Sequence, residues 1–204
     1  METKDRILQA ALLLFTRHGI KSVSMNDIAS ELGISKKTLY KWFDNKDELV
    51  SVVIGDHLCR VQGECAGFAE AADNAVDEMV RIMEWAKRHF AEVNPNTIHD
   101  LRKYYPAAWQ LFDHHKNQYI LTQIQANLRR GVAEGLYRPD LDVEVLSRLR
   151  LAQIDVLFDP DVFPHADFGQ PRVQQACNEH FLLGMVTLRG HKLVNEYRHI
   201  TEEE

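Results

Sequence analysis

The chain has 204 residues, 45% of them hydrophobic, which suffices for one large globular domain or two small ones. No stretch approaches 18 consecutive apolar residues, so the sequence predicts no transmembrane helix. Its beginning lacks the basic, apolar and small-residue order of a signal peptide, and we therefore expect a cytoplasmic protein. The three cysteines are scattered and form no C-x-x-C pair, so they suggest neither a disulfide framework nor a zinc module.

The net charge of −6 is unevenly distributed along the chain. Residues 1–47 contain eight basic and six acidic side chains, a net charge of +2, and the remainder carries −8. Four of the eight cations fall within residues 36–46. Because phosphate contacts need only a local cluster of cations, the acidic total does not exclude a protein that binds nucleic acid.

Helical spacing recurs throughout the chain and strand-like alternation is absent, which predicts an all-α fold of about nine helices. The first helix is expected over residues 4–18 and ends before Gly19, the usual place for a helix-terminating glycine. A short second helix should follow Ser24, with Asp27 at the position that completes a capping box. Gly33 then stops this helix.

A third helix is expected directly after Ser35, whose hydroxyl is placed to cap it. Leu39 and Phe43 lie four residues apart and should form its buried face. A long fourth helix should begin near Lys46. The later helices are expected over about 75–93, 97–103, 106–135, 141–158 and 171–198, with prolines near several of their ends.

Two short helices joined by a glycine turn cannot form a core by themselves, so residues 24–46 predict a helix-turn-helix packed on the first and fourth helices. The second helix of such a pair enters the major groove of DNA. Its exposed face would consist of hydrogen-bond donors and cations, namely Lys36, Lys37, Thr38, Tyr40 and Lys41, with the indole of Trp42 beside them.

The string ASELGISKKTLYKWFDNKDEL at residues 29–49 resembles the DNA-binding signature of the TetR family (TetR/AcrR-like) of transcriptional regulators. The resemblance begins at ILQAA, residues 7–11, and includes FTRHG, residues 15–19. The fragment GVAEGLYR at residues 131–138 is also similar to the end of a long helix in the ligand domain of many members. The resemblance implies a DNA-binding domain over residues 1–48 and a helical regulatory and dimerisation domain over residues 49–204.

The family pattern implies a role for each matching residue. Thr38, Tyr40 and Lys46 match phosphate contacts, and Lys36 and Lys37 match variable positions that read bases. Met25 and Asn26 match positions that often touch DNA, whereas Trp42 stands where the family often has His or Tyr. The alternatives are a solvated face for the lysines, ordinary packing for Tyr40 and a core position for Met25.

The resemblance further implies a homodimer on a palindromic operator of double-stranded DNA, controlled by a small-molecule effector whose identity the sequence does not give. Candidate pocket residues are polar or aromatic side chains on otherwise buried faces, and core packing is the alternative for each: Trp85, His89, Trp109, Phe112, Tyr119 and Gln123. The last two helices are the expected dimer surface, with an intramolecular core face as the alternative. The helix over 171–198 contributes an apolar stripe of Val173, Cys177, Phe181, Gly184 and Leu188, and the expected partners on the helix over 141–158 are Val143, Leu146 and Leu149 or Arg150.

The sequence suggests no cofactor, metal ligand set or catalytic residue. No phosphate-binding loop or nucleophile motif is present, and His114 and His115, being adjacent, point in different directions on a helix. We therefore expect a ligand-responsive regulator, a repressor, and not an enzyme. The rivals are an activator, a regulator controlled by a protein partner, and a helical small-molecule-binding or enzymatic protein that binds no operator DNA.

Overall fold

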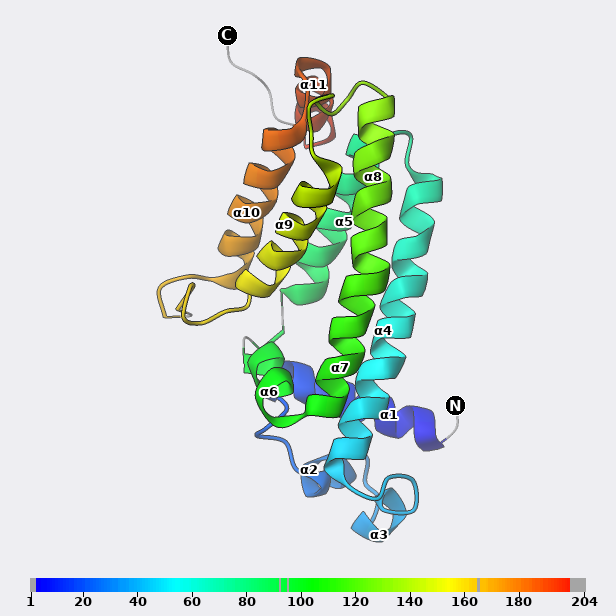
Figure 1. Cartoon of the computed structure of the whole chain (residues 1–204). Helices are drawn as coiled ribbons and strands as arrows, with labels where there is room; N and C mark the ends of the chain where they lie inside the picture. Colours follow the sequence, from blue (N-terminus) through cyan, green and yellow to red (C-terminus); the bar gives the residue numbers. More distant parts are fainter. Residues whose placement is uncertain (1–2, 92, 95, 165, 199–204) are drawn as a thin grey trace. The chain divides into compact units, whose positions relative to one another are not determined.

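The structure, a computed structural model, describes residues 3–91, 93–94, 96–164 and 166–198 (Figure 1). Its elements are α1 (Thr3–His18), α2 (Met25–Glu31), α3 (Lys36–Leu39), α4 (Lys46–Ala71), α5 (Ala75–Phe90), α6 (Asn96–Tyr104), α7 (Pro106–His115), a π-helical turn (Lys116–Ile120), α8 (Leu121–Ala133), α9 (Val143–Val156), α10 (Gln170–Met185) and α11 (Leu188–Tyr197). Because α7, the π-helical turn and α8 are contiguous, the described residues form ten continuous helices, nine of them at least seven residues long. The expected all-α fold of about nine helices is confirmed.

The chain divides into two compact units. Unit 1 comprises Met1–Val61 and Glu92–His115, and unit 2 comprises Gln62–Ala91 and Lys116–Glu204. Unit 1 includes α6 and α7 because the stretch around α6 bonds to the end of α1: the Asn94 amide donates to the Thr16 carbonyl at 2.7 Å. The expected boundary after residue 48 separates a DNA-binding domain from a regulatory domain by function and not by compactness, and it stays a prediction.

Unit 1 has one apolar core, to which the first four helices contribute their expected faces. Ile7, Ala11 and Phe15 of α1 are buried together with Leu39 and Phe43. The remaining core positions come from α1, α2, α4, α6, α7 and the connections between helices: Leu8, Ile20, Val23, Met25, Ile28, Ala29, Leu49, Val50, Val53, Ile54, Leu101, Tyr105 and Ala108. The helical spacing of Leu39 and Phe43 therefore predicted their burial correctly.

Unit 2 is a bundle in which α5 packs on α8, α10 and α11, and α8 packs on α9 (Figure 1). Its centre contains a polar network: the Tyr137 hydroxyl donates to the Ala75 carbonyl at 3.0 Å and lies 3.0 Å from the Asn127 side-chain oxygen. The Tyr137 ring lies directly against Gly131, where a Cβ atom would come within 2.1 Å of a ring carbon. A residue without a side chain is therefore required at position 131 for α8 and this tyrosine to pack.

The expected single helix over 171–198 is wrong, because the chain breaks between α10 and α11. Val186 adopts an extended conformation and forms a bridge with Tyr137, and the Thr187 hydroxyl caps α11 by accepting from the Gly190 amide at 3.2 Å. A Cβ atom at Gly190 would lie 2.2 Å from the Leu136 carbonyl oxygen. The glycine that the pattern placed inside one long helix thus allows α11 to approach the chain after α8.

The expected dimer stripe on this segment is also partly wrong. Val173 and Phe181 are 4% and 5% exposed, and Phe181 belongs to the core of unit 2. Gly184 and Leu188 are exposed, and Cys177 is half-buried. Helical periodicity revealed an apolar stripe but not its neighbour, and the same chain covers Val173 and Phe181. Of the expected partners on α9, Val143 and Leu146 pack against the core of unit 2, and Leu149 is 51% exposed.

Among the described residues, no helix combines the length and the low polarity that crossing a bilayer requires. The same residues contain no group of three or more His, Cys, Asp or Glu side chains arranged to hold a metal ion. All three cysteines are free thiols.

Candidate nucleic-acid interface

The helix-turn-helix is built by side-chain caps that the sequence places at its joints. Ser24 and Asp27 form the expected capping box at α2: the Ser24 amide donates to the Asp27 carboxylate at 2.8 Å, and the Asp27 amide donates to the Ser24 hydroxyl at 3.3 Å. The hydrogen bonds from the Ser24 amide and hydroxyl hold the pKa of the Asp27 carboxyl below its usual value. The negative charge also lies in the first turn of α2, where the helix dipole favours it.

The turn between α2 and α3 depends on Gly33, whose φ of +64° lies in the left-handed region. After this turn, the Ser35 hydroxyl accepts from the Thr38 amide at 3.1 Å and lies 2.9 Å from the Thr38 hydroxyl. Leu39 and Phe43 are 0% and 2% exposed and anchor the segment to the core of unit 1. The regular part of α3 is a single turn of four residues, and turns follow it through residue 42.

The side chains opposite these anchors form the exposed face that the sequence predicts. Lys36, Lys37 and Lys41 are exposed, and Tyr40 and Trp42 keep 47% and 43% of their surface accessible. Large exposed side chains that lie together mark contact sites more often than isolated ones do. The face therefore presents three cations and two aromatic groups with hydrogen-bonding atoms.

Three of the four other predicted DNA contacts lie in less exposed surroundings or at the edge of this face. Thr38 is half-buried, and its hydroxyl is paired with that of Ser35. Asn26 is exposed on the first turn of α2, whereas Met25 is only 7% exposed and is part of the unit 1 core. The burial of Met25 agrees with the core alternative for its side chain, and leaves its backbone as the part able to approach DNA.

Lys46 is engaged inside the protein. Its ammonium donates to the Ile20 carbonyl at 2.6 Å and to the Lys21 carbonyl at 3.4 Å, and it lies 5.4 Å from the centre of the Tyr105 ring. Burial lowers the pKa of Lys46, and the nearby carboxylate of Asp100 opposes this effect. The family role of this lysine as a phosphate contact therefore requires its ammonium to exchange these carbonyls for a phosphate.

Sequence reasoning missed the residues that hold the connection between α1 and α2. Asp100 of α6 is 7% exposed, and its carboxylate accepts from the Lys21 amide at 2.9 Å. Gly19, with φ of +82°, lies beside the same carboxylate, which a Cβ atom would approach to 3.3 Å. Asp100 is about 80 residues from this connection, so no local spacing could have indicated the contact.

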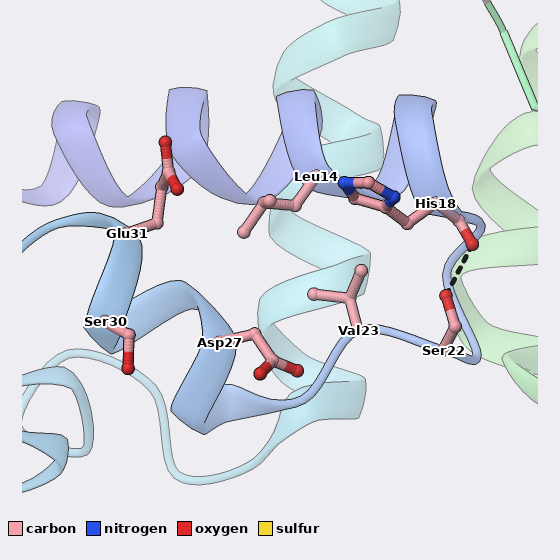
Figure 2. Close-up of a pocket in the computed structure, with 7 residues that line it drawn as sticks. All are labelled: Leu14, His18, Ser22, Val23, Asp27, Ser30 and Glu31. Carbon is pink, nitrogen blue, oxygen red and sulfur yellow. Dashed lines mark hydrogen bonds between the residues drawn. The ribbon is translucent and has the colours of Figure 1, made fainter.

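A groove between α1 and α2 lies next to this joint, with a volume of about 710 Å³ (Figure 2). Leu14 and His18 come from α1, and Asp27, Ser30 and Glu31 from α2, with Ser22 and Val23 closing one end. Two carboxylates line this groove and no lysine or arginine does. It is therefore unsuited to phosphate, and the exposed face of α3 remains the candidate interface.

The candidate ligand residues are found in both units. In unit 2, Trp85 stacks on His89 with ring centres 4.5 Å apart, and the indole N–H donates to Glu64 at 3.0 Å. The Tyr119 hydroxyl donates to the Gln62 carbonyl at 3.2 Å, so these side chains meet neighbouring residues of α4. Gln123 is half-buried on α8.

In unit 1, Trp109 and Phe112 of α7 pack against each other at 5.4 Å. In unit 2, the Trp85–His89 pair is part of a larger aromatic group that also contains Phe68, Phe90 and Phe158. Sequence spacing alone did not indicate this group. A cavity of about 80 Å³ elsewhere in unit 2, between α5 and α10, is lined by none of the six candidates. Such a volume is well below the roughly 300 Å³ of the smallest usual ligand pockets.

Comparison with known proteins gives the following similarities. Residues 7–53 match the family described as bacterial regulatory proteins, tetR family. The HTH-type transcriptional repressor KstR2 of Mycolicibacterium smegmatis is 26% identical over 152 residues, which cover 71% of this chain and 72% of that protein. An HTH-type transcriptional regulator of Staphylococcus aureus is 45% identical over 53 residues, covering 26% of this chain and 29% of its own length.

Solved structures share the fold over most of the chain. A protein of Saccharomonospora viridis in complex with choline has a TM-score of 0.75 and 22% identity, covering 90% of this chain and 97% of its own. The regulator FadR of Bacillus subtilis in complex with stearoyl-CoA has a TM-score of 0.69 and 17% identity, covering 89% of this chain and 99% of its own. At these identities the similarity shows a common fold only. The ligand named for each of these proteins belongs to that protein.

Proposed function

The chain belongs to the TetR family of bacterial regulators, and from this premise we propose that it is a repressor that binds one operator sequence and releases it when a small molecule binds. The observation that carries the proposal is the exposed face of α3. Three lysines, Tyr40 and Trp42 point away from a helix-turn-helix whose caps and anchors are all in place. The relatives named for their function are transcriptional regulators, which supports a non-enzymatic role, and a role on chromosomal DNA implies a cytoplasmic location.

In this proposal each part of the face has its own task. Lys36 and Lys37 read base edges in the major groove, where a good contact discriminates by about 1–3 kcal/mol. Thr38 and Tyr40 bind backbone phosphates on either side, and Lys41, Trp42 and Asn26 extend the contact surface. The aggregate charge of the rest of the chain, −8, disfavours DNA binding over most of the remaining surface.

The effector is proposed to bind in the helical regulatory part, among the aromatic side chains around Trp85 and His89. Support comes from the stacked, half-exposed rings and the adjacent Glu64 carboxylate, and from the two solved structures of this fold that hold choline and stearoyl-CoA. Because the Trp85 and His89 rings are stacked 4.5 Å apart, they must separate for a ligand to enter between them. Tyr119 and Gln123 are the other candidates in unit 2, and the predicted role of Trp109 and Phe112 in unit 1 stays a separate prediction.

A homodimer is proposed because one short reading helix contacts too few base pairs to find a single site in a genome. Exposed apolar residues on α9 and α10 support a surface for a second copy: Val145 and Leu149 are 59% and 51% exposed, and Leu183 is 42% exposed. Gly184, beside Leu183, lies in open space, since a Cβ atom there would have no neighbour within 4 Å, and it could allow close approach of two helices. Leu149→Glu or Gly184→Glu is expected to give a folded monomer with greatly weakened operator binding, which sedimentation would detect.

The function is tested by selecting genomic fragments with the purified protein and measuring their binding across a series of salt concentrations. We expect one or a few palindromic fragments to be enriched, with half-sites about one DNA turn apart. Lys37→Ala should change which bases are preferred in the half-site. If no fragment binds better than random DNA at any salt concentration, the chain is a helical ligand-binding protein without an operator, and the proposal is wrong.

A further inference from the structure

Four cations of unit 1 lie over three aromatic rings at the junction of α6 and α7, and we refer to them as the cation–aromatic cluster. Lys21 and Lys103 lie 4.6 Å and 5.4 Å from the centre of the Tyr104 ring, on which they converge. Lys46 lies over Tyr105 and Arg102 over Trp109, at 5.4 Å and 5.7 Å. Contacts of this kind hold the long cationic side chains near fixed positions.

The positive charge of this cluster is largely uncompensated. Within the part of the chain that the structure describes, no carboxylate forms an ion pair with Lys21, Arg102 or Lys103, and all three are exposed. Asp100 is buried and accepts from the Lys21 amide, and Asp47 and Asp27 are further carboxylates whose charges act on Lys46. The hydrogen bond from the Lys21 ammonium, at 3.1 Å, and the charge of Lys103 lower the pKa of the Tyr104 hydroxyl.

The cluster is continuous with the predicted DNA-binding surface. The Lys46 ammonium, which the family pattern assigns to a phosphate, lies 3.4 Å from the carbonyl oxygen of Lys21. Lys21 itself belongs to the connection that leads from α1 into α2 of the helix-turn-helix. A polyanion bound at Lys46 therefore has further cations next to it, on a chain whose remaining surface is acidic overall.

We propose that the cation–aromatic cluster is a second site for the DNA backbone, in which Lys21, Arg102 and Lys103 bind phosphates outside the base pairs that α3 reads. The inference rests on the proposed DNA-binding function and adds a surface from α6, about 60 residues beyond the helix-turn-helix in sequence. Its contribution is independent of base sequence, because phosphates carry no sequence information. It should appear as affinity and salt dependence and leave operator choice unchanged.

The test compares the variant Arg102→Gln/Lys103→Gln with the matched control Lys87→Gln/Lys192→Gln. Both variants remove two cations, but Lys87 and Lys192 belong to unit 2, so the control reports the effect of net charge alone. Affinity for the selected operator fragment is measured between about 50 and 300 mM salt. Each phosphate contact contributes about 0.9 to the slope of log affinity against log salt, so we expect the slope of the cluster variant to fall by about 1.8 per subunit, or about 3.6 for the proposed dimer.

A second readout locates the contacts. Ethylation of individual phosphates interferes with binding wherever the protein needs that phosphate, and the cluster variant should lose interference at phosphates that flank the bases read by α3. Interference within the half-site and the order of preference among operator variants should remain as in the wild type. Circular dichroism checks that the exposed substitutions leave the helical content unchanged.

The outcomes separate the two proposals. If the cluster variant and the control change the slope equally, and the interference pattern is unaltered while wild type binds its operator, the cluster is only a solvated surface and the inference is wrong. If wild type binds no operator at all, the proposed function itself fails and the inference falls with it. A loss of base preference in the cluster variant would instead show that α6 acts on the position of α3, which also overturns the inference.

Discussion

Replacing Lys46 with alanine removes an ammonium that the structure places on the backbone of the connection after α1. The hydrogen bond from Lys46 to the Ile20 carbonyl is 2.6 Å long, and hydrogen bonds to charged groups contribute about 1.5–3 kcal/mol. Because Lys46 is half-buried, water can partly replace the lost donor, so we expect the lower end of this range, about 1.5 kcal/mol. For a chain of this size such a loss lowers the melting temperature by about 3–6 °C.

The same substitution should also weaken binding to every DNA sequence by a similar factor. If Lys46 contacts a phosphate, its removal lowers the slope of log affinity against log salt by about 0.9 per subunit, or about 1.8 for the proposed dimer. Thermal denaturation followed by circular dichroism measures the first effect, and fluorescence anisotropy with labelled operator at several salt concentrations measures the second. Lys46→Met keeps the apolar stem over Tyr105 and so separates the loss of packing from the loss of charge.

The two measurements test two different statements. An unchanged melting temperature would show that the carbonyl contacts of Lys46 contribute nothing to stability. An unchanged salt slope, together with full affinity, would refute the phosphate assignment and leave Lys46 as a structural residue. A lower melting temperature with a lower slope is the result expected from an ammonium that exchanges carbonyls for phosphate.

Three further changes have defined outcomes. Gly131→Ala should lower stability by about 1–3 kcal/mol or more, because the new methyl group overlaps the Tyr137 ring. Gly184→Ala, in open space, should be neutral or stabilise the protein by up to about 1 kcal/mol. Urea denaturation of both variants measures the difference. Ser35→Ala removes the cap of α3 and should cost about 0.5–2 kcal/mol together with operator affinity, as measured by denaturation and anisotropy. Burial, and to a lesser degree the charge of His114, lower the pKa of His115, so the unfolded chain binds more protons than the folded chain near and below pH 6.5. Stability should therefore fall as the pH decreases from 6.5, and it should fall less in His115→Gln. An equal fall in both proteins would contradict this.

The helix-turn-helix could be predicted from sequence because its determinants are local. The caps Ser24 and Ser35 act within three residues of their partners, Gly33 forms its turn locally, and the anchors Leu39 and Phe43 lie four residues apart on one face. Short-range spacing is therefore sufficient to specify these elements. The exposed face of α3 follows directly, since it is the side opposite the anchors.

Features that depend on contacts between residues far apart in the sequence could not be predicted from local residue spacing. Phe181 belongs to an apolar stripe whichever chain covers it, and only the packing of unit 2 shows that it faces inward. The break at Val186 requires a bridge to Tyr137, and the environment of Lys46 requires Tyr105, almost 60 residues away. The DNA and ligand contacts themselves stay predictions, because they depend on molecules other than this chain.

The one-turn length of α3 has a consequence for how such a regulator can change over evolutionary time. Isolated helices shorter than about 12 residues are marginal in water, so four residues hold their shape here only through Ser35 and the two anchors beneath them. Lys36 and Lys37 are exposed and have no part in that support. Substitutions at these two positions can therefore change the operator that the protein prefers with little loss of stability. Paralogues produced by gene duplication can in this way keep the same fold while they come to bind different DNA sequences.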